Sequence, residues 1–206
     1  KDPYLVLKKE SNEKAKEILP NLIIQNVRDS LIVGILGNKI DYGACILPDY
    51  DLNKMKEDFE DLENIPLQID DMNIFLEKLH KAKTVAFCVD NHGEVIFDTS
   101  ILEYIGNKVG KENLFIVGKG GPMLNDVTAS ELKELGFEKY GQIVSTGSNC
   151  FGLHSEDVSQ ECKDLLKEVD LIVAKGQAYL EFFTEYNFTN VINVLRVKYP
   201  IVNLAF

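Results

Sequence analysis

The second part of the chain alternates short apolar runs with amphipathic segments. Apolar runs rich in β-formers predict buried strands over residues 84–90, 114–119, 142–146, 170–175 and 191–197. Apolar positions at helical spacing predict helices between them, over residues 93–107, 128–136, 155–169 and 178–185. Because alternating strands and helices form right-handed crossovers, we expect an α/β fold: a three-layer α/β/α sandwich with a mostly parallel sheet.

The first part of the chain shows helical spacing only. Predicted helices cover residues 11–20, 22–36, 51–63 and 71–80, with Ser11 as the N-cap of the first and Gly37-Asn38 ending the second. We therefore expect an N-terminal helical subdomain over residues 1–81 and an α/β/α core that binds metal and phosphate over residues 82–206.

Charge and composition narrow the class of protein. The 206 residues are 45% hydrophobic and 27% charged, which is typical of a soluble globular protein. The 22 basic and 33 acidic residues give a net charge of −11, which argues against partners such as duplex nucleic acid or an anionic membrane. No apolar run approaches the roughly 20 residues of a membrane span, and the opening lacks the apolar core of a signal peptide. Four cysteines without CxxC spacing predict reduced thiols in a cytoplasmic protein. Nothing in the sequence indicates an oligomeric state.

Polar residues gather where the predicted strands end. Ligands bind beyond the carboxyl ends of the strands in an open parallel sheet, so turns far apart in the sequence meet there. The candidate residues are Asp90, Asn91, Gly93 and Glu94 after the first strand, Lys119, Asn125 and Asp126 after the second, Ser148 and Asn149 after the third, and Lys175 at the end of the fourth.

These residue types favour phosphate chemistry on a hard divalent ion. Asp90, Asn91 and Asp126 would supply two negative charges and one neutral oxygen, which suits Mg²⁺ or Mn²⁺ rather than zinc. The Asn91–Gly93 turn opens a helix, so its amides can point at an anion. We expect Lys175 at the rim to add positive charge.

Each feature also has a simpler interpretation. Asp90 and Asp126 could be helix N-caps, Lys175 could be a solvated lysine at a strand end, and His92 could be a hydrogen-bonded surface residue.

Two known phosphate-binding motifs do not match this sequence. The glycines near Lys119 do not follow the P-loop pattern. Compared with haloacid-dehalogenase-type phosphatases, His92 replaces the second Asp of their motif. The coincidence of the candidates at one sheet edge favours the functional interpretation.

Three ordered motifs resemble those of the damage-control phosphatases, domain-of-unknown-function family eighty-nine, in its archaeal and bacterial single-domain branch. They are Asp90-Asn91-His92-Gly93-Glu94, the stretch from Lys119 to Thr128, and the stretch from Asp170 to Gln177. The opening DPYLVLKKESNEKA and residues 37–43 are similar to the helical part of that branch. His92 stands where the family usually has a small residue and could narrow the pocket mouth. In the stretch 148–152 an Asp common in the family is replaced.

The resemblance implies hydrolysis of small phosphomonoesters, such as sugar phosphates or damaged cofactor-related phosphates. It implies metal ligands at Asp90, Asn91 and Asp126 and a phosphate contact at Lys175. The expected cofactor is Mn²⁺, Co²⁺, Ni²⁺ or Mg²⁺, and the expected partner is a small phosphorylated metabolite contacted by Gly93, Glu94, Lys119, Asn125, Ser148 and Asn149.

Two questions stay open from the sequence. The attacking group is either a water on the metal, which we favour, or the Asp90 carboxylate. The same residues could also serve a non-catalytic sensor of a phosphorylated metabolite; turnover of p-nitrophenyl phosphate separates an enzyme from such a sensor.

Overall fold

The computed structural model describes residues 2–38, 59, 61–154 and 156–197. Its centre is a sheet of five strands: β1 (Val85–Cys88), β2 (Leu114–Gly118), β3 (Gln142–Ser145), β4 (Leu171–Lys175) and β5 (Val191–Val194). The strands pair in the order β3-β2-β1-β4-β5, and every pairing is parallel. The predicted strands and the α/β fold are confirmed.

The direction of winding reverses between β1 and β4. From β1 the chain moves outward through β2 to β3, whereas from β4 it moves outward to β5 on the other side. Right-handed crossovers then place the two sets of helices on opposite faces of the sheet. The first set is α5 (Glu94–Phe97), α6 (Thr99–Val109) and α7 (Ala129–Glu134), and the second is α8 (Gln160–Glu168) and α9 (Gln177–Glu185). Such a reversal is where open α/β sheets bind ligands.

Each strand sends alternate side chains into two separate apolar clusters. Along β1, Val85 and Phe87 belong to the cluster under α6, while Ala86 and Cys88 belong to the cluster under α8 and α9. All four side chains are fully buried. Burial on both faces explains why the strands are continuous apolar runs rather than alternating ones.

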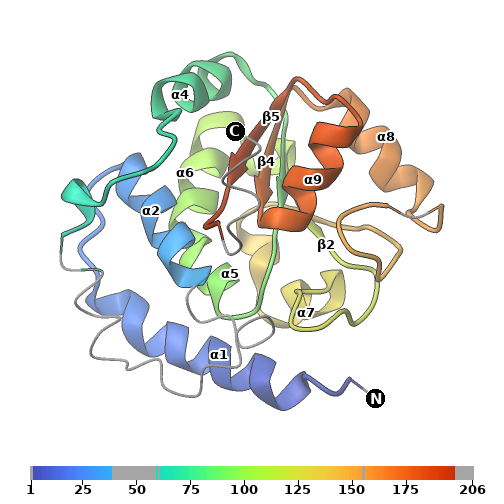
Figure 1. Ribbon diagram of the computed structural model, residues 1–206, viewed down its shortest axis with the longest axis horizontal. Coiled ribbons are helices and arrows are strands. Elements are labelled where there is room, and N and C mark those ends of the chain that lie inside the picture. The colour runs from blue at the N-terminus through green and yellow to red at the C-terminus, as the bar shows by residue number, and fades with distance from the viewer. Residues whose placement is uncertain (1, 39–58, 60, 155, 198–206) are drawn as a thin grey trace.

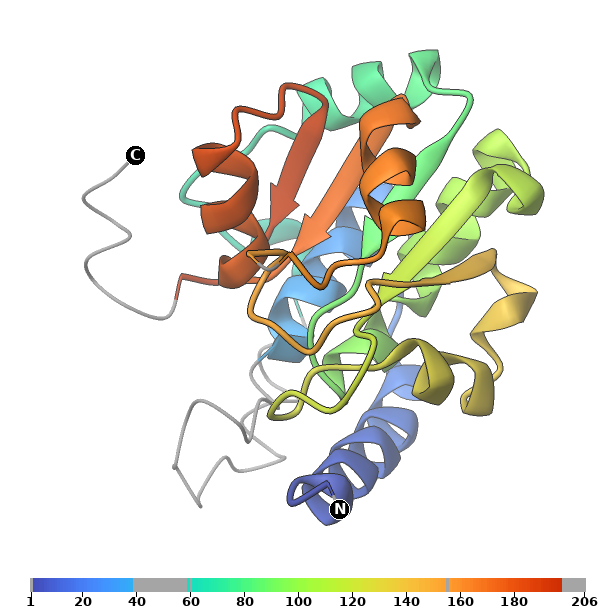
Figure 2. The same ribbon diagram turned by 90° about the vertical axis from the view of Figure 1, so that its right-hand side faces the viewer.

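Helices α1 (Leu5–Ile18), α2 (Val27–Gly37) and α4 (Met72–Lys81) precede the sheet in the chain. Ile32 of α2 and Phe75 of α4 belong to the same apolar cluster as Phe87 of β1. Helix α1 contacts α5 and lies at the end of the molecule toward which the strand arrows point (Figure 2). The helical region therefore packs on one face and one end of the sheet, and the subdomain boundary at Lys81 stays a prediction.

Short 3-10 helices occur at Leu19–Asn21, Leu62–Asn64, Lys111–Asn113 and Phe137–Lys139. Figure 1 shows how the helices surround the sheet, with α1 along the lower edge. No helix in the described ranges is long and apolar enough to cross a membrane.

Four predicted helix boundaries are wrong. Ser11 is not an N-cap but lies inside α1, which begins at Leu5 with Tyr4 as the N-cap residue. The Asp2 carboxylate accepts a hydrogen bond from Tyr4 N at 2.8 Å just before the helix. Helix α2 begins at Val27 rather than residue 22, because the Asn26 side chain caps it by accepting from Asp29 N.

The third correction concerns residues 93–107, which form two helices, α5 and α6, that meet at Asp98. The fourth concerns α8, which begins at Gln160 rather than at residue 155, because the Ser159 side chain caps it by accepting from Cys162 N. The predicted helix over residues 51–63 lies mostly outside the described residues. Residues 39–43, part of the stretch 37–43 that is similar to the helical part of the family, lie outside them as well.

Candidate active site

Asp90 and Gly176 meet across the point where the winding reverses. Asp90 follows β1, Gly176 follows β4, and these strands are paired neighbours. A Cβ on Gly176 would lie only 2.2 Å from Asp90 Oδ2, so the carboxylate occupies the space where a side chain would be. Gly176 also has a φ of +84°, which favours glycine. The Asp90 carboxylate thus lies at the predicted edge of the sheet.

The segment after β2 returns to the end of β1 and pairs with it. Val127 N donates to Asp90 O at 2.9 Å, and His92 N donates to Asn125 O at 2.9 Å. Between these hydrogen bonds, Asn91 and Asp126 form an antiparallel bridge. The three predicted metal ligands, Asp90, Asn91 and Asp126, therefore lie on two directly paired segments.

Neither aspartate caps a helix. The N-cap of α7 is Thr128, whose Oγ1 accepts from Glu131 N while the Glu131 carboxylate accepts from Thr128 N. Helix α5 starts after Gly93 and has no side-chain cap. The simpler interpretation of Asp90 and Asp126 as caps is therefore wrong, and their position beside each other calls for a different explanation.

The orientation of the Asn91 amide fits a metal site. Its Nδ2 donates to Asp90 Oδ2 at 2.8 Å and to Glu94 Oε2 at 3.4 Å. Since both amide hydrogens face carboxylates, Oδ1 is the amide atom that is left to face an ion. Within the described ranges, no three His, Cys, Asp or Glu side chains form a metal-binding group. The candidate set consists of two aspartates, Asp90 and Asp126, and the asparagine Asn91. Their oxygen atoms suit a hard divalent ion.

Lys175 is buried, so the prediction of a lysine at the rim is wrong. Its Nζ lies 2.8 Å from Glu94 Oε1 and 2.7 Å from Asp98 Oδ1, and all three side chains are almost fully inaccessible. The side chain is held inward because α5 and α6 pass beside the end of β4 and present these two carboxylates.

Because one lysine is shared by two buried carboxylates, the pKa values of the lysine and of Asp98 are both shifted. Burial raises the pKa of Asp98, Lys175 lowers it in part and Glu94 raises it again, which leaves the pKa at about 7. Burial lowers the pKa of Lys175, but Asp98 and Glu94 raise it above its ordinary value. The lysine therefore stays charged, and Asp98 takes up a proton more readily than an ordinary aspartate.

Glu94 is positioned to hold Asn91 rather than to contact a substrate. It accepts hydrogen bonds from Asn91 and from Asn38 Nδ2, and it is 1% exposed. Asn38 ends α2 and is also buried. The sequence indicated Asn38 as part of a helix stop and of the stretch 37–43 that is similar to the family's helical part, but nothing in it pointed to this contact.

Lys119 ties the loop after β3 to the site. Its Nζ donates to Cys150 O at 2.9 Å and Gly152 O at 3.0 Å, and lies 3.5 Å from Asp126 Oδ2. The same ammonium lies 4.9 Å from the centre of the Tyr179 ring. Lys119 is buried, and it brings positive charge close to a predicted metal ligand.

The remaining predicted contacts divide into buried and exposed groups. Asn125 and Ser148 are buried, and Ser148 Oγ accepts from Cys150 N at 3.2 Å. Asn149 is exposed, with its Nδ2 3.5 Å from Pro122 O. Gly93 N donates to Asn12 Oδ1 at 2.7 Å, so the expectation that this amide points at an anion is wrong.

His92 does not narrow a pocket mouth. It is 4% exposed, its Nδ1 lies 2.9 Å from Asn12 Nδ2, and its Nε2 lies 3.1 Å from Glu131 Oε2. Asn12 and Glu131 were missed in the sequence, because one lies in the first helix and the other looks like an ordinary helix-surface acid.

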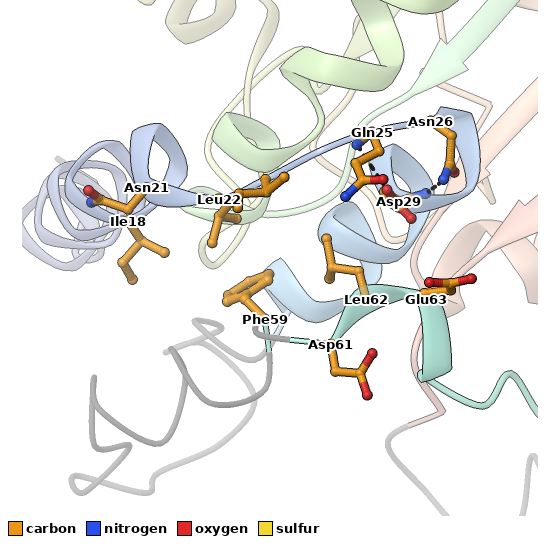
Figure 3. A pocket seen from close by; sticks show the side chains of 11 residues that line it. Ile18, Asn21, Leu22, Gln25, Asn26, Asp29, Phe59, Asp61, Leu62 and Glu63 are labelled. Atoms are coloured by element: carbon orange, nitrogen blue, oxygen red, sulfur yellow. Dashed lines mark hydrogen bonds between the residues drawn. The ribbon is translucent and has the colours of Figure 1, made fainter.

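Two cavities lie away from this sheet edge. One, of about 550 Å³, is lined by the end of α1, the start of α2, and residues 59 and 61–63 (Figure 3). The other, of about 540 Å³, lies between α2, residues 66–72 and β5. Neither is lined by a predicted site residue. Asp29, Asp61 and Glu63 make the first cavity unfavourable for a phosphate.

Comparison with known proteins agrees with the motifs. The family described as damage-control phosphatase ARMT1-like domain matches residues 1–204. The chain belongs to this family. It is 31% identical to Damage-control phosphatase PH1575 of Pyrococcus horikoshii over 98% of this chain and 69% of that protein. It is 29% identical to a protein named Damage-control phosphatase from Archaeoglobus fulgidus, over 96% of this chain and 69% of that one.

Solved structures give the same answer. The crystal structure of the DUF89 family protein PH1575 matches with a TM-score of 0.87 and 30% identity, over 99% of this chain and 71% of that chain. The resemblance stated from the motifs is therefore confirmed, both for the family and for the fold.

Proposed function

We propose that this chain is a divalent-metal-dependent phosphatase that hydrolyses phosphomonoesters of small, damaged metabolites. The observation that carries the proposal is the pairing of the Asp90–Asn91 segment with Asp126 at the reversal of the sheet. Membership of a family whose relatives are named damage-control phosphatases supports the reaction type.

Asp90, Asn91 and Asp126 would hold the ion, which is Mn²⁺, Co²⁺, Ni²⁺ or Mg²⁺. When bound, such an ion neutralises phosphate charge and makes a coordinated water more acidic. A cation is needed here for an electrostatic reason: the chain carries a net charge of −11, and two carboxylates at the site would repel a phosphate dianion.

The surrounding residues hold the ligand set in place. Gly176 leaves room for the Asp90 carboxylate, and Glu94 accepts from the Asn91 amide so that Oδ1 turns outward. The buried Lys175 neutralises Glu94 and thereby supports Asn91 indirectly. We assign Lys175 a positioning role, and Lys119, beside Asp126, is the better candidate for the cation that helps to attract a phosphate.

We favour water as the attacking group, which an ion held by Asp90, Asn91 and Asp126 would make more acidic. The alternative is attack by Asp90, which would form a phospho-aspartate. The Asp90 carboxylate accepts from Asn91 and lies against Gly176, so both of these contacts would have to tolerate a phosphoryl group. Acid quenching followed by detection of phospho-aspartate distinguishes the two.

The test is turnover of p-nitrophenyl phosphate after metal removal and addition of each of the four ions, followed by phosphorylated sugars and cofactor fragments. Asp126→Asn should lower turnover by at least a hundredfold and weaken Mn²⁺ binding in calorimetry. Asp164→Asn, the same substitution at an exposed position of α8, is the matched control and should change neither. Metal binding without turnover of any phosphomonoester would favour the sensor instead.

A further inference from the structure

Helix α1 meets the candidate active site through a polar face. Lys8 and Asn12 are one helical turn apart, and they are 1% and 5% exposed. Farther along the same helix the buried residues are the apolar Ala15 and Ile18. Apolar contacts alone would dock the helix in many similar registers, whereas buried polar groups need specific partners.

Asn12 binds two consecutive residues of the turn that follows Asn91. Its Oδ1 accepts from Gly93 N at 2.7 Å, and this assigns the amide orientation because a backbone N–H can only donate. Its Nδ2 must then donate to His92 Nδ1, 2.9 Å away. Nδ1 is therefore the unprotonated nitrogen of the neutral ring, and the hydrogen lies on Nε2.

Nε2 of His92 lies beside Glu131, at ion-pair distance but without the geometry of a hydrogen bond, and Glu131 also holds the other ligand-bearing segment. Glu131 Oε2 lies 3.1 Å from His92 Nε2, 2.9 Å from Thr128 N and 2.7 Å from Thr128 Oγ1. Thr128 follows Asp126 by two residues in the segment that pairs with Asn91. One carboxylate therefore links the Asp90–Gly93 turn to the Asp126–Thr128 segment.

Lys8 completes the network from α1. Its Nζ lies 3.2 Å from Glu131 Oε1 and 2.8 Å from Asp2 Oδ2. Lys8 places a positive charge against the partly buried Glu131, and it does so from the same helix face that carries Asn12. Helix α1, which lies across this end of the sheet (Figure 2), thus contacts His92 through Asn12 and Glu131 through Lys8.

We propose that Asn12 and His92 are positioning residues of the active site: together with Glu131 and Lys8 they fix the spacing between the Asp90–Asn91 turn and Asp126. This inference rests on the proposed function, because the spacing matters for activity only if Asp90, Asn91 and Asp126 bind a metal ion. None of the four side chains is assigned contact with substrate. Residues that orient metal ligands typically change metal affinity or activity by about 10- to 100-fold when they are replaced.

The test compares Asn12→Ala with Ser11→Ala. Ser11 is equally buried on α1 but donates only to Leu7 O within the helix, so it is a matched control. Asn12→Ala should raise the Mn²⁺ dissociation constant about tenfold and lower kcat for p-nitrophenyl phosphate, with KM at saturating Mn²⁺ little changed. Ser11→Ala should match the parent. Asn12→Asp, which retains the acceptor for Gly93 N, should lie between them. His92→Asn, which keeps an acceptor for Asn12, should recover most of the affinity lost in His92→Leu.

Two metal-free measurements separate this inference from the proposed function. Hydrogen exchange of amides in residues 90–93 and 126–128 should accelerate in Asn12→Ala but not in Ser11→Ala. Nitrogen NMR of the parent should show His92 protonated on Nε2. Normal exchange and Mn²⁺ affinity in Asn12→Ala, equal losses in Ser11→Ala, or a proton on Nδ1 would overturn the inference. If the parent binds no Mn²⁺, the proposed function fails while the exchange result still decides the positioning role.

Discussion

The carboxylate of Asp90 lies against the backbone of Gly176, and the two residues leave adjacent strands at the reversal of the sheet. A methyl group on residue 176 would lie 2.2 Å from Asp90 Oδ2, and a side chain would also be strained at a φ of +84°. The space for the candidate metal ligand thus depends on a residue that has no side chain.

Gly176→Ala should therefore weaken Mn²⁺ binding by more than tenfold and destabilise the fold by about 1–3 kcal/mol. Gly136→Ala is the matched control, because Gly136 has a similar φ of +76° but nothing within 4 Å of an added Cβ. It should lose stability from backbone strain alone and leave Mn²⁺ affinity unchanged. Calorimetry and chemical denaturation measure both effects. Equal Mn²⁺ affinity in the two variants would contradict the placement of Asp90 in the site.

Asn91→Asp should make the stability of the protein depend on metal. The substitution replaces an amide that donates to Asp90 and Glu94 with a third carboxylate, so the metal-free protein should unfold at a lower temperature. Mn²⁺ should restore that loss and bind at least as tightly as in the parent. Turnover should be much poorer, since the added charge repels the phosphate.

The control for this variant is Asn113→Asp, a partly buried amide that donates to Val109 O away from the site. It should also lose stability, but Mn²⁺ should not restore the loss. A thermal shift for Asn91→Asp that is the same with and without Mn²⁺ would show that residue 91 does not face a metal.

Lys175→Met should destabilise the fold strongly and in a pH-dependent way. Removing the lysine leaves Glu94 and Asp98 buried without their cation, and breaking such a pair costs about 3–5 kcal/mol. The loss should be smaller at pH 5 than at pH 8, because burial raises the pKa of Asp98 and this carboxyl group can take up a proton at the lower pH. Denaturation at the two pH values measures this, and adding Asp98→Asn should recover part of the loss at pH 8.

Lys81→Met removes an exposed lysine paired with Glu77 and should change stability little at either pH. If Lys175→Met is instead as stable as the parent but no longer binds vanadate, then Lys175 contacts phosphate and its buried position changes on ligand binding.

Glu131 should stabilise the protein down to acidic pH. Burial raises the pKa of Glu131, but contacts with His92 and hydrogen bonds from Thr128 outweigh it and lower the pKa to about 2 from an ordinary 4.5. A lowered folded-state pKa contributes stability above pH 4.5 that is lost as the pH falls toward 2. Because the group is partly exposed, we expect the effect to be on the order of 1–2 kcal/mol.

Unfolding measured between pH 5 and pH 2.5 should therefore show a steeper loss of stability in the parent than in Glu131→Gln. Glu134→Gln, on the same helix outside the network, should follow the parent. Parallel pH profiles for the parent and Glu131→Gln would mean that Glu131 titrates normally in the folded protein.

The strands and the meeting of Asp90, Asn91 and Asp126 were predictable because they depend on local patterns and one topological rule. A buried parallel strand must be an apolar run, and the residues after such strands converge on one edge whatever the loops do. The family motifs, each contiguous in the chain, carried the same information. The helix starts at Leu5 and Val27 were less predictable. Helix α1 begins without a side-chain cap, so no capping residue marks its start, and α2 is capped by a single side chain, Asn26, which accepts from Asp29 N.

The roles of Lys175 and His92 depend on partners far away in the chain. Lys175 is buried because Glu94 and Asp98, 77 or more residues earlier, are turned toward it, and His92 is oriented by Asn12, 80 residues away. A lysine or histidine side chain can be exposed to solvent or buried in a polar network. The residues next to it in the sequence do not distinguish the two cases. The free energy that selects between them comes from long-range charge pairing and desolvation, which exist only once the helices have packed on the sheet.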